Sequence, residues 1–160
     1  VVPWFNSEEW RHVHRLLQNR ANRNHLKQAH EILQVWKKRT PNLPCGVEGT
    51  LILLDALLFE DNGRCATIIR PAYGMILIRF LNFCCASGDK QGTFSESVKA
   101  CNIPEWIVNT RHDLAHKHRI PKTPILKKAL EFCFDWVVKN YWDKQAETLV
   151  SHYSVSCLIE

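Results

Sequence analysis

The 160-residue sequence has no apolar run long enough to cross a membrane. A transmembrane helix needs about 20 consecutive, mostly apolar residues, and every apolar stretch here is shorter or interrupted by charge. The first residues, Val1 to Phe5, also lack the basic segment followed by an apolar segment that marks a signal peptide. We therefore expect no membrane association. The absence of an initial methionine indicates a fragment of a longer protein.

The seven cysteines include no C-x-x-C pair, their number is odd, and Cys84 and Cys85 are adjacent. This pattern favours reduced thiols of the cytosol or nucleus over a disulfide scaffold. Cys101 and Cys133 lie among apolar residues at helical spacing, where cysteine usually packs as a small hydrophobic residue. We expect no cysteine nucleophile.

Glycine-rich loops, low-complexity tracts, internal repeats and strand-like alternation are absent as well. Instead, apolar residues recur at helical spacing between polar or proline-bearing segments. With 46% hydrophobic residues, the chain suits a single all-α domain spanning 1–160 with its own core. We expect a bundle of about six helices. Four candidate segments span 7–18, 24–39, 47–60 and 71–87, two more begin at Ile103 and Thr123, and a seventh, short one starts at Thr93.

The predicted helix at 71–87 is apolar on nearly all sides, apart from Arg79 and Asn82. A helix of this kind is typical of the interior of a bundle. Arg79 must then either find an ion-pair partner or emerge at an edge of the core.

The net charge of +5 is modest, but it is unevenly placed. Residues 1–40 hold eight Lys/Arg against three Glu, and residues 111–128 hold six Lys/Arg against Asp113 alone. Such runs often form ordinary solvated faces. They also suit a polyanion, whose phosphates would be bound in a salt-dependent manner with little sequence preference.

The second basic cluster coincides with an unusual run at 109–118, Asn-Thr-Arg-His-Asp-Leu-Ala-His-Lys-His. Arg111 carries a permanent charge in a planar fork that matches phosphate oxygens. His112 and His116 can accept and donate protons near pH 7. These three side chains supply what RNA cleavage by the 2′-hydroxyl requires: a base, an acid and positive charge on the phosphorane. They are therefore the candidate catalytic residues, and the candidate RNA-binding residues that follow are Lys117, His118, Arg119 and Lys122.

Helical geometry constrains this set. His112 and His116 would share one helix face, whereas Arg111 is turned by about 100° from His112 and about 140° from His116. A single uninterrupted helix presents the three groups poorly. We expect either that the helix ends near His116 or that a second copy of the chain completes the site.

Two other interpretations of the run stay open. Histidines at the end of a basic helix are commonly solvated residues that interact favourably with the helix dipole. His112, His116 and His118 also form H-x-x-x-H-x-H, a spacing compatible with zinc. No glutamate lies between the first two histidines to act as a hydrolytic base, which argues against a protease-like zinc site. We expect no cofactor.

The run matches the R-x-x-x-x-H signature of HEPN ribonucleases, here in the R-H-x-x-x-H form. Nearly the whole chain resembles the N-terminal domain of the Las family of pre-ribosomal RNA endonucleases, in a metazoan-like form. The stretches that carry this resemblance are Trp36–Arg39, Tyr73–Met75, Arg79–Asn82 and Ile103–Val108, the last running directly into Arg111. Ala115 departs from the pattern, because a hydroxyl residue is more usual there.

The resemblance implies a dimerising HEPN-type helical bundle in which two motifs form one composite site. It further implies a metal-independent cut in the second internal transcribed spacer of the ribosomal RNA precursor, in the nucleolus, leaving a 2′,3′-cyclic phosphate and a 5′-hydroxyl. A polynucleotide 5′-kinase would be the partner, bound mainly through a C-terminal region that this chain does not contain. Arg111 would hold the phosphate, while His112 and His116 would share base and acid duties. The alternatives are a non-catalytic RNA-binding or dimerisation module and a zinc-stabilised helical domain.

Overall fold

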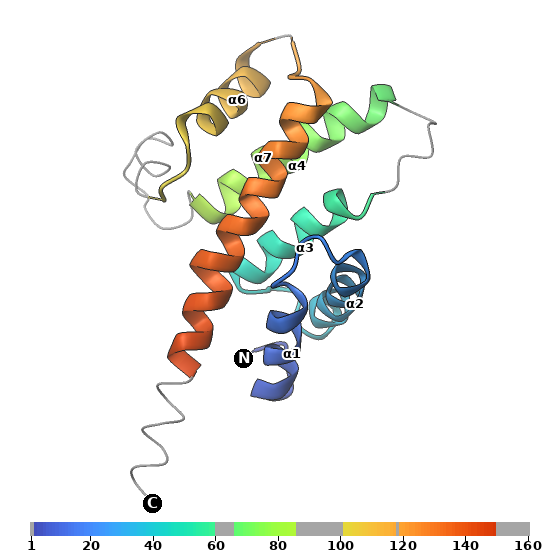
Figure 1. The fold of residues 1–160 in the computed structure, drawn as a ribbon, viewed down its shortest axis with the longest axis vertical. Coiled ribbons are helices and arrows are strands. Elements are labelled where there is room, and N and C mark those ends of the chain that lie inside the picture. Colours follow the sequence, from blue (N-terminus) through green and yellow to red (C-terminus); the bar gives the residue numbers. More distant parts are fainter. Residues whose placement is uncertain (1, 60–65, 86–100, 118, 150–160) are drawn as a thin grey trace, which may run out of the picture. The chain divides into compact units, whose positions relative to one another are not determined.

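The computed structural model describes residues 2–59, 66–85, 101–117 and 119–149, and every regular element in these ranges is helical (Figure 1). The all-α, HEPN-type fold class predicted from the sequence is thus confirmed for the described part of the chain. The short helix expected from Thr93 lies outside it. The α-helices are α1 (Ser7–Leu16), α2 (Arg23–Arg39), α3 (Cys45–Leu57), α4 (Ala66–Cys85), α6 (Glu105–His116) and α7 (Thr123–Val137), and α7 continues into the π-helix η1 (Val138–Asp143).

The chain divides into two compact units. The first combines Val1–Leu51 with Phe134–Glu160, and the second consists of Ile52–Cys133. The candidate site lies wholly in the second unit. That residues 1–160 form one domain stays a prediction.

Stacked tryptophans fill the core of the first unit. Trp10, Trp36 and Trp142 are completely buried, and the ring centroids of Trp10 and Trp142 lie 5.1 Å apart. The indole N–H of Trp142 donates to Thr50 Oγ1 at 2.9 Å. The ring of Trp142 therefore belongs to the packed interior.

Glu9 joins α1 to α2 through its carboxylate. The carboxylate accepts hydrogen bonds from Trp36 Nε1 at 2.8 Å and Arg39 Nη1 at 2.7 Å, and it also accepts one from the backbone N–H of Phe5 at 2.9 Å. Asn6 caps the start of α1, since its Oδ1 accepts the N–H of Glu9. Trp36 and Arg39, which belong to one of the stretches that carried the resemblance, thus have a structural role.

Helix α4 differs from its prediction in two ways. It begins at Ala66, five residues before the expected start, so that Pro71 lies inside it. It is also buried on one side only: Tyr73, Leu77, Phe80 and Leu81 are buried, whereas Ile68, Met75 and Phe83 are exposed by 64%, 69% and 38%. Arg79 is exposed, so it emerges from the core rather than lying within it.

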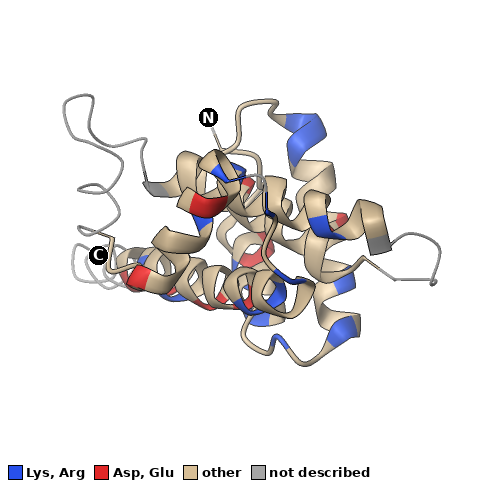
Figure 2. Cartoon of the chain, turned by 90° about the horizontal axis from the view of Figure 1, so that it is seen from above, with Lys and Arg blue, Asp and Glu red and all other residues tan. Residues whose placement is uncertain are grey.

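Charged residues of both signs occur on several helices, and neither sign is confined to one element (Figure 2). Part of the basic excess at 1–40 is paired within the first unit. Arg11 pairs with Glu8 and Arg39 with Glu9, and Lys37 pairs with Glu48 across 2.6 Å. The N-terminal excess is therefore partly structural.

Candidate active site

The motif helix α6 begins directly after Pro104 and ends at His116. Its first turn is closed by the Pro104 carbonyl, which accepts from the N–H of Ile107 at 3.0 Å. Its last turn is closed by the N–H of Lys117, which donates to the Asp113 carbonyl at 2.8 Å, and the backbone of Lys117 is already extended. Of the two arrangements expected from helical geometry, the structure shows the helix ending at His116.

The two histidines lie side by side at this C-terminal end. The ring centroids of His112 and His116 are 4.7 Å apart, with the rings tilted by 52°. Both side chains are exposed. Two imidazoles at this distance can both reach one bound phosphodiester, on which a base and an acid must act together.

Arg111 lies on a different side of α6 and contacts α4. Its Nη2 donates to Asn82 Oδ1 at 3.3 Å, and its side chain is only partly exposed. Burial lowers the pKa of the Arg111 guanidinium below its usual value, although it remains charged at neutral pH. A partly dehydrated guanidinium binds phosphate more strongly than a fully hydrated one, because less water must be removed.

Asn82 is a site residue to which the sequence assigned no role. The only signal for it was its place in the Arg79–Asn82 stretch, which is common to the resembled family but lies 29 positions from Arg111 in the chain. The contact between these two side chains exists only because α4 and α6 pack against each other.

A close approach at Gly74 allows this packing. A Cβ atom on Gly74 would lie 2.8 Å from Leu114 Cδ2, so a glycine lets α6 lie closer to α4 than a larger residue would. Ile107 and Thr110 form the buried side of α6, and the Thr110 hydroxyl donates to the Trp106 carbonyl at 2.7 Å. Gly74 and its buried neighbour Tyr73 belong to another stretch that carried the resemblance.

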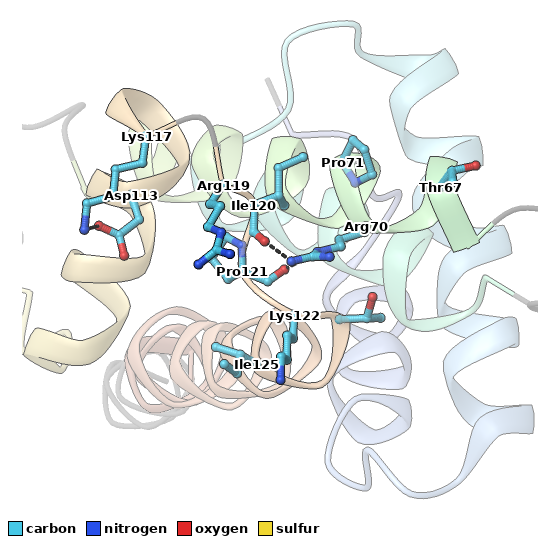
Figure 3. A pocket seen from close by; sticks show the side chains of 11 residues that line it. Thr67, Arg70, Pro71, Asp113, Lys117, Arg119, Ile120, Pro121, Lys122 and Ile125 are labelled. Carbon is cyan, nitrogen blue, oxygen red and sulfur yellow. Dashed lines mark hydrogen bonds and ion pairs between the residues drawn. The ribbon is translucent and has the colours of Figure 1, made fainter.

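The predicted RNA-binding residues follow the motif in a groove of about 1320 Å³ (Figure 3). Lys117, Arg119 and Lys122 line it, while His118 lies outside the described residues. Lys117, Arg119 and Lys122 are all exposed. Lys117 Nζ is paired with Asp113 Oδ1 at 2.9 Å. The structure therefore brings three of the four predicted residues to one groove.

Within the described residues, no group of three His, Cys, Asp or Glu side chains is arranged to hold a metal ion. The zinc alternative included His118 and so extends beyond these residues. In the same part of the chain, none of the helices combines the length and the hydropathy that a membrane crossing requires.

Fold and site together define a helical protein in which one helix carries an arginine along its length and ends with two exposed histidines. The chain belongs to the Las1-like family, whose sequence model matches residues 2–144. It is 33% identical over 159 residues to the ribosomal biogenesis protein LAS1L of Mus musculus, an alignment that covers 92% of this chain and 19% of the mouse protein. It is 26% identical over 118 residues to protein LAS1 of Saccharomyces cerevisiae, covering 68% of this chain and 23% of the yeast protein. The chain thus spans about a fifth of the length of the curated relatives it matches.

Proposed function

We propose that this domain is a metal-independent endoribonuclease that cuts ribosomal RNA precursors during assembly of the large ribosomal subunit. The observation that carries the proposal is the pair of exposed histidines, 4.7 Å apart, at the end of the helix that also bears Arg111. Membership of the Las1-like family supports a role in ribosome biogenesis, which the name of the mouse relative states for that protein.

The reaction follows from the chemistry of the three side chains. One histidine removes the proton of the ribose 2′-hydroxyl, whose oxygen attacks the adjacent phosphorus. The bond from phosphorus to the 5′-oxygen breaks, and the other histidine donates a proton to that oxygen. Arg111 neutralises charge on the phosphorane through its planar donors. The products are a 2′,3′-cyclic phosphate and a 5′-hydroxyl, and no step needs a metal.

The active unit in this proposal is a homodimer. Arg111 is held against α4 by Asn82, whereas His112 and His116 face solvent, so one chain presents its charge and its proton-transfer groups on different sides. The exposed apolar residues Ile68 and Met75 of α4 offer surface that a second copy can cover. Two copies would then bring one motif opposite the other.

The substrate in this proposal is the second internal transcribed spacer, and the place of action is the nucleolus. A polynucleotide 5′-kinase is the partner that phosphorylates the new 5′-hydroxyl. Its main binding region lies outside these 160 residues.

An RNA cleavage assay on the complex with the kinase tests the proposal. Positioned acid-base groups contribute about 10² to 10⁴ each in rate, so the His112→Ala, His116→Ala double variant and Arg111→Ala are expected to lose at least about 10². The matched control is His12→Ala, His25→Ala, which removes two exposed histidines of the first unit. End-group analysis should find the cyclic phosphate, and EDTA should leave the rate unchanged.

Three outcomes would contradict the proposal. A motif double variant that cuts at the wild-type rate removes the histidines from catalysis. Variants that weaken RNA binding without changing any cleavage product indicate a non-catalytic module. Activity that EDTA abolishes and only zinc restores indicates the metal site of His112, His116 and His118.

A further inference from the structure

The groove beside the motif is built by four segments of the second unit: the start of α4, the end of α6, residues 119–122 and the start of α7 (Figure 3). Its volume of about 1320 Å³ exceeds the roughly 300 to 1,000 Å³ of a usual small-molecule site. A cavity of this size suits a piece of an extended chain better than a compact ligand.

Arg70 of α4 holds the segment 119–122, which forms one wall of the groove. Its Nε donates to the Pro121 carbonyl at 2.7 Å, and its Nη2 donates to the Ile120 carbonyl. Charge-assisted bonds from one planar group to two successive carbonyls fix both position and direction of the segment. Because these carbonyls lie between Arg119 and Lys122 in sequence, Arg70 sets where both of those side chains leave the backbone.

The charge of the groove is strongly one-sided. Among the described residues that line it, four are basic, namely Arg70, Lys117, Arg119 and Lys122, and Asp113 is the one carboxylate. Lys117, Arg119 and Lys122 are exposed. The spread of three solvent-accessible cations along an open groove suits a series of phosphates, each neutralised by one contact.

Apart from Thr67 and Thr123, the rest of the lining is apolar and lies among these cations. Pro71, Ile120, Pro121 and Ile125 face the groove, and Ile125 is 43% exposed. Apolar walls can contact base faces only when the bases are unstacked and unpaired, as in a single strand. An acidic peptide would satisfy the cations but would gain little from these walls.

We propose that this groove binds single-stranded RNA that continues from the cleavage point, with Lys117, Arg119 and Lys122 on its phosphates and the apolar wall on its bases. Lys117 directly follows His116 at the end of α6, so the groove begins where the proton-transfer groups end. Arg70 is a positioning residue, because it acts on the strand through the segment it holds. The proposal rests on the proposed nuclease function, since it takes the same RNA as ligand.

Binding is measured without cleavage, using a fluorescent RNA of roughly 12 nucleotides, within the span of single-strand sites, whose 2′-hydroxyls are methylated and cannot attack. The test variant is Arg119→Gln, Lys122→Gln. The matched control is Lys127→Gln, Lys128→Gln, which removes the same charge from exposed positions of α7 that do not line the groove.

The expected loss of RNA affinity depends on salt concentration in a predictable way. Each single-strand phosphate contact contributes a slope of about 0.7 in log K against log salt. The test variant should therefore lose about 1.4 of slope and about 25-fold in affinity at 0.1 M salt, while the control stays near wild type. Asp113→Asn, which releases Lys117 from its ion pair, should bind more tightly. Arg70→Met should weaken binding of the single strand by a similar factor while its circular dichroism stays that of a folded helical chain.

Several results would overturn the groove assignment. The test and control variants could lose the same affinity and slope, or a duplex could bind as tightly as the single strand and respond equally to the test variant. Displacement of the RNA by polyglutamate at equal charge concentration would assign the groove to an acidic protein segment. None of these results depends on cleavage, so the nuclease proposal stands or falls separately on the His112→Ala, His116→Ala rate.

Discussion

The contact between Asn82 and Arg111 predicts an ordered series of cleavage rates. The Nη2 to Oδ1 distance of 3.3 Å is at the long end for a hydrogen bond, and Asn82 is exposed. Hydrogen bonds of this kind stabilise a protein by about 0.5 to 1.5 kcal/mol, and we expect this one to lie near the lower limit. If its role is to aim the guanidinium at the phosphate, Asn82→Ala should lower the single-turnover rate by about 2- to 5-fold, since about 1.36 kcal/mol is tenfold in rate.

The Asn82→Asp variant tests whether Asn82 positions the Arg111 guanidinium or only fills space beside it. The carboxylate keeps the size and the acceptor of asparagine, but it forms an ion pair with Arg111 and competes with the phosphate for the guanidinium. The aspartate variant should therefore be slower than the alanine variant, although its fold is at least as stable. Rates are measured under single-turnover conditions on the complex, with thermal unfolding as the control for folding. An aspartate variant that cuts as fast as wild type, or faster than the alanine variant, would refute this role of Asn82.

Three further predictions concern the first unit. Burial alone would raise the pKa of Glu9, but its hydrogen bonds from Phe5, Trp36 and Arg39 outweigh this effect and lower the pKa. The ionised Glu9 therefore stabilises the folded chain fully above the unfolded pKa, and this stabilisation is lost as pH falls through the lower folded pKa. Glu9→Gln should remove this acid dependence of the unfolding free energy, measured by urea unfolding between neutral and acid pH. Gly46→Ala should destabilise the chain by about 1 to 3 kcal/mol or more, because the new Cβ would lie 2.1 Å from Cγ of the Tyr141 ring. A double variant with Tyr141→Leu should recover part of this loss. If the two substitutions change the unfolding free energy independently, the clash is contradicted. Burial, with a smaller effect of Cys45, raises the pKa of Tyr141 to about 12. Ultraviolet titration should therefore show a tyrosine that ionises at higher pH than an ordinary phenol, and the loss of this ionisation in Tyr141→Phe would assign it to Tyr141.

Local patterns predicted most of the described helices, because apolar spacing and helix ends depend on neighbouring residues. The start of α1 at residue 7 and the end of α6 at His116 are of this kind. The start of α4 was predicted wrongly, since proline usually marks a helix beginning. Pro71 is tolerated inside α4 partly because Thr67, whose carbonyl loses its hydrogen bond, is exposed and can bind water.

The rest of the candidate site could not be predicted from spacing, because it depends on packing between distant segments. Asn82 reaches Arg111, and Arg70 reaches the carbonyls at 120 and 121, only after α4 has packed beside α6 and the chain that follows it. The sequence could not predict that α4 is buried on one side only. An apolar residue gives the same pattern whether it packs into a core or lies on an exposed surface that a partner can cover.

The split between Arg111 on one side of α6 and the two histidines on another makes a last prediction about the active unit. Chains carrying Arg111→Ala keep both histidines, and chains carrying His112→Ala, His116→Ala keep the arginine. When equal amounts are dissociated, mixed and reassociated, about half of the dimers combine the two kinds, because a twofold interface pairs identical surfaces at random. If the arginine of one copy serves the histidines of the other, each mixed dimer regains one complete set, and activity returns well above that of either variant alone. If instead each chain cuts by itself, every chain in the mixture lacks an essential group and activity stays at the level of the single variants. A folded monomer that cuts at the wild-type rate would remove the need for a second copy altogether.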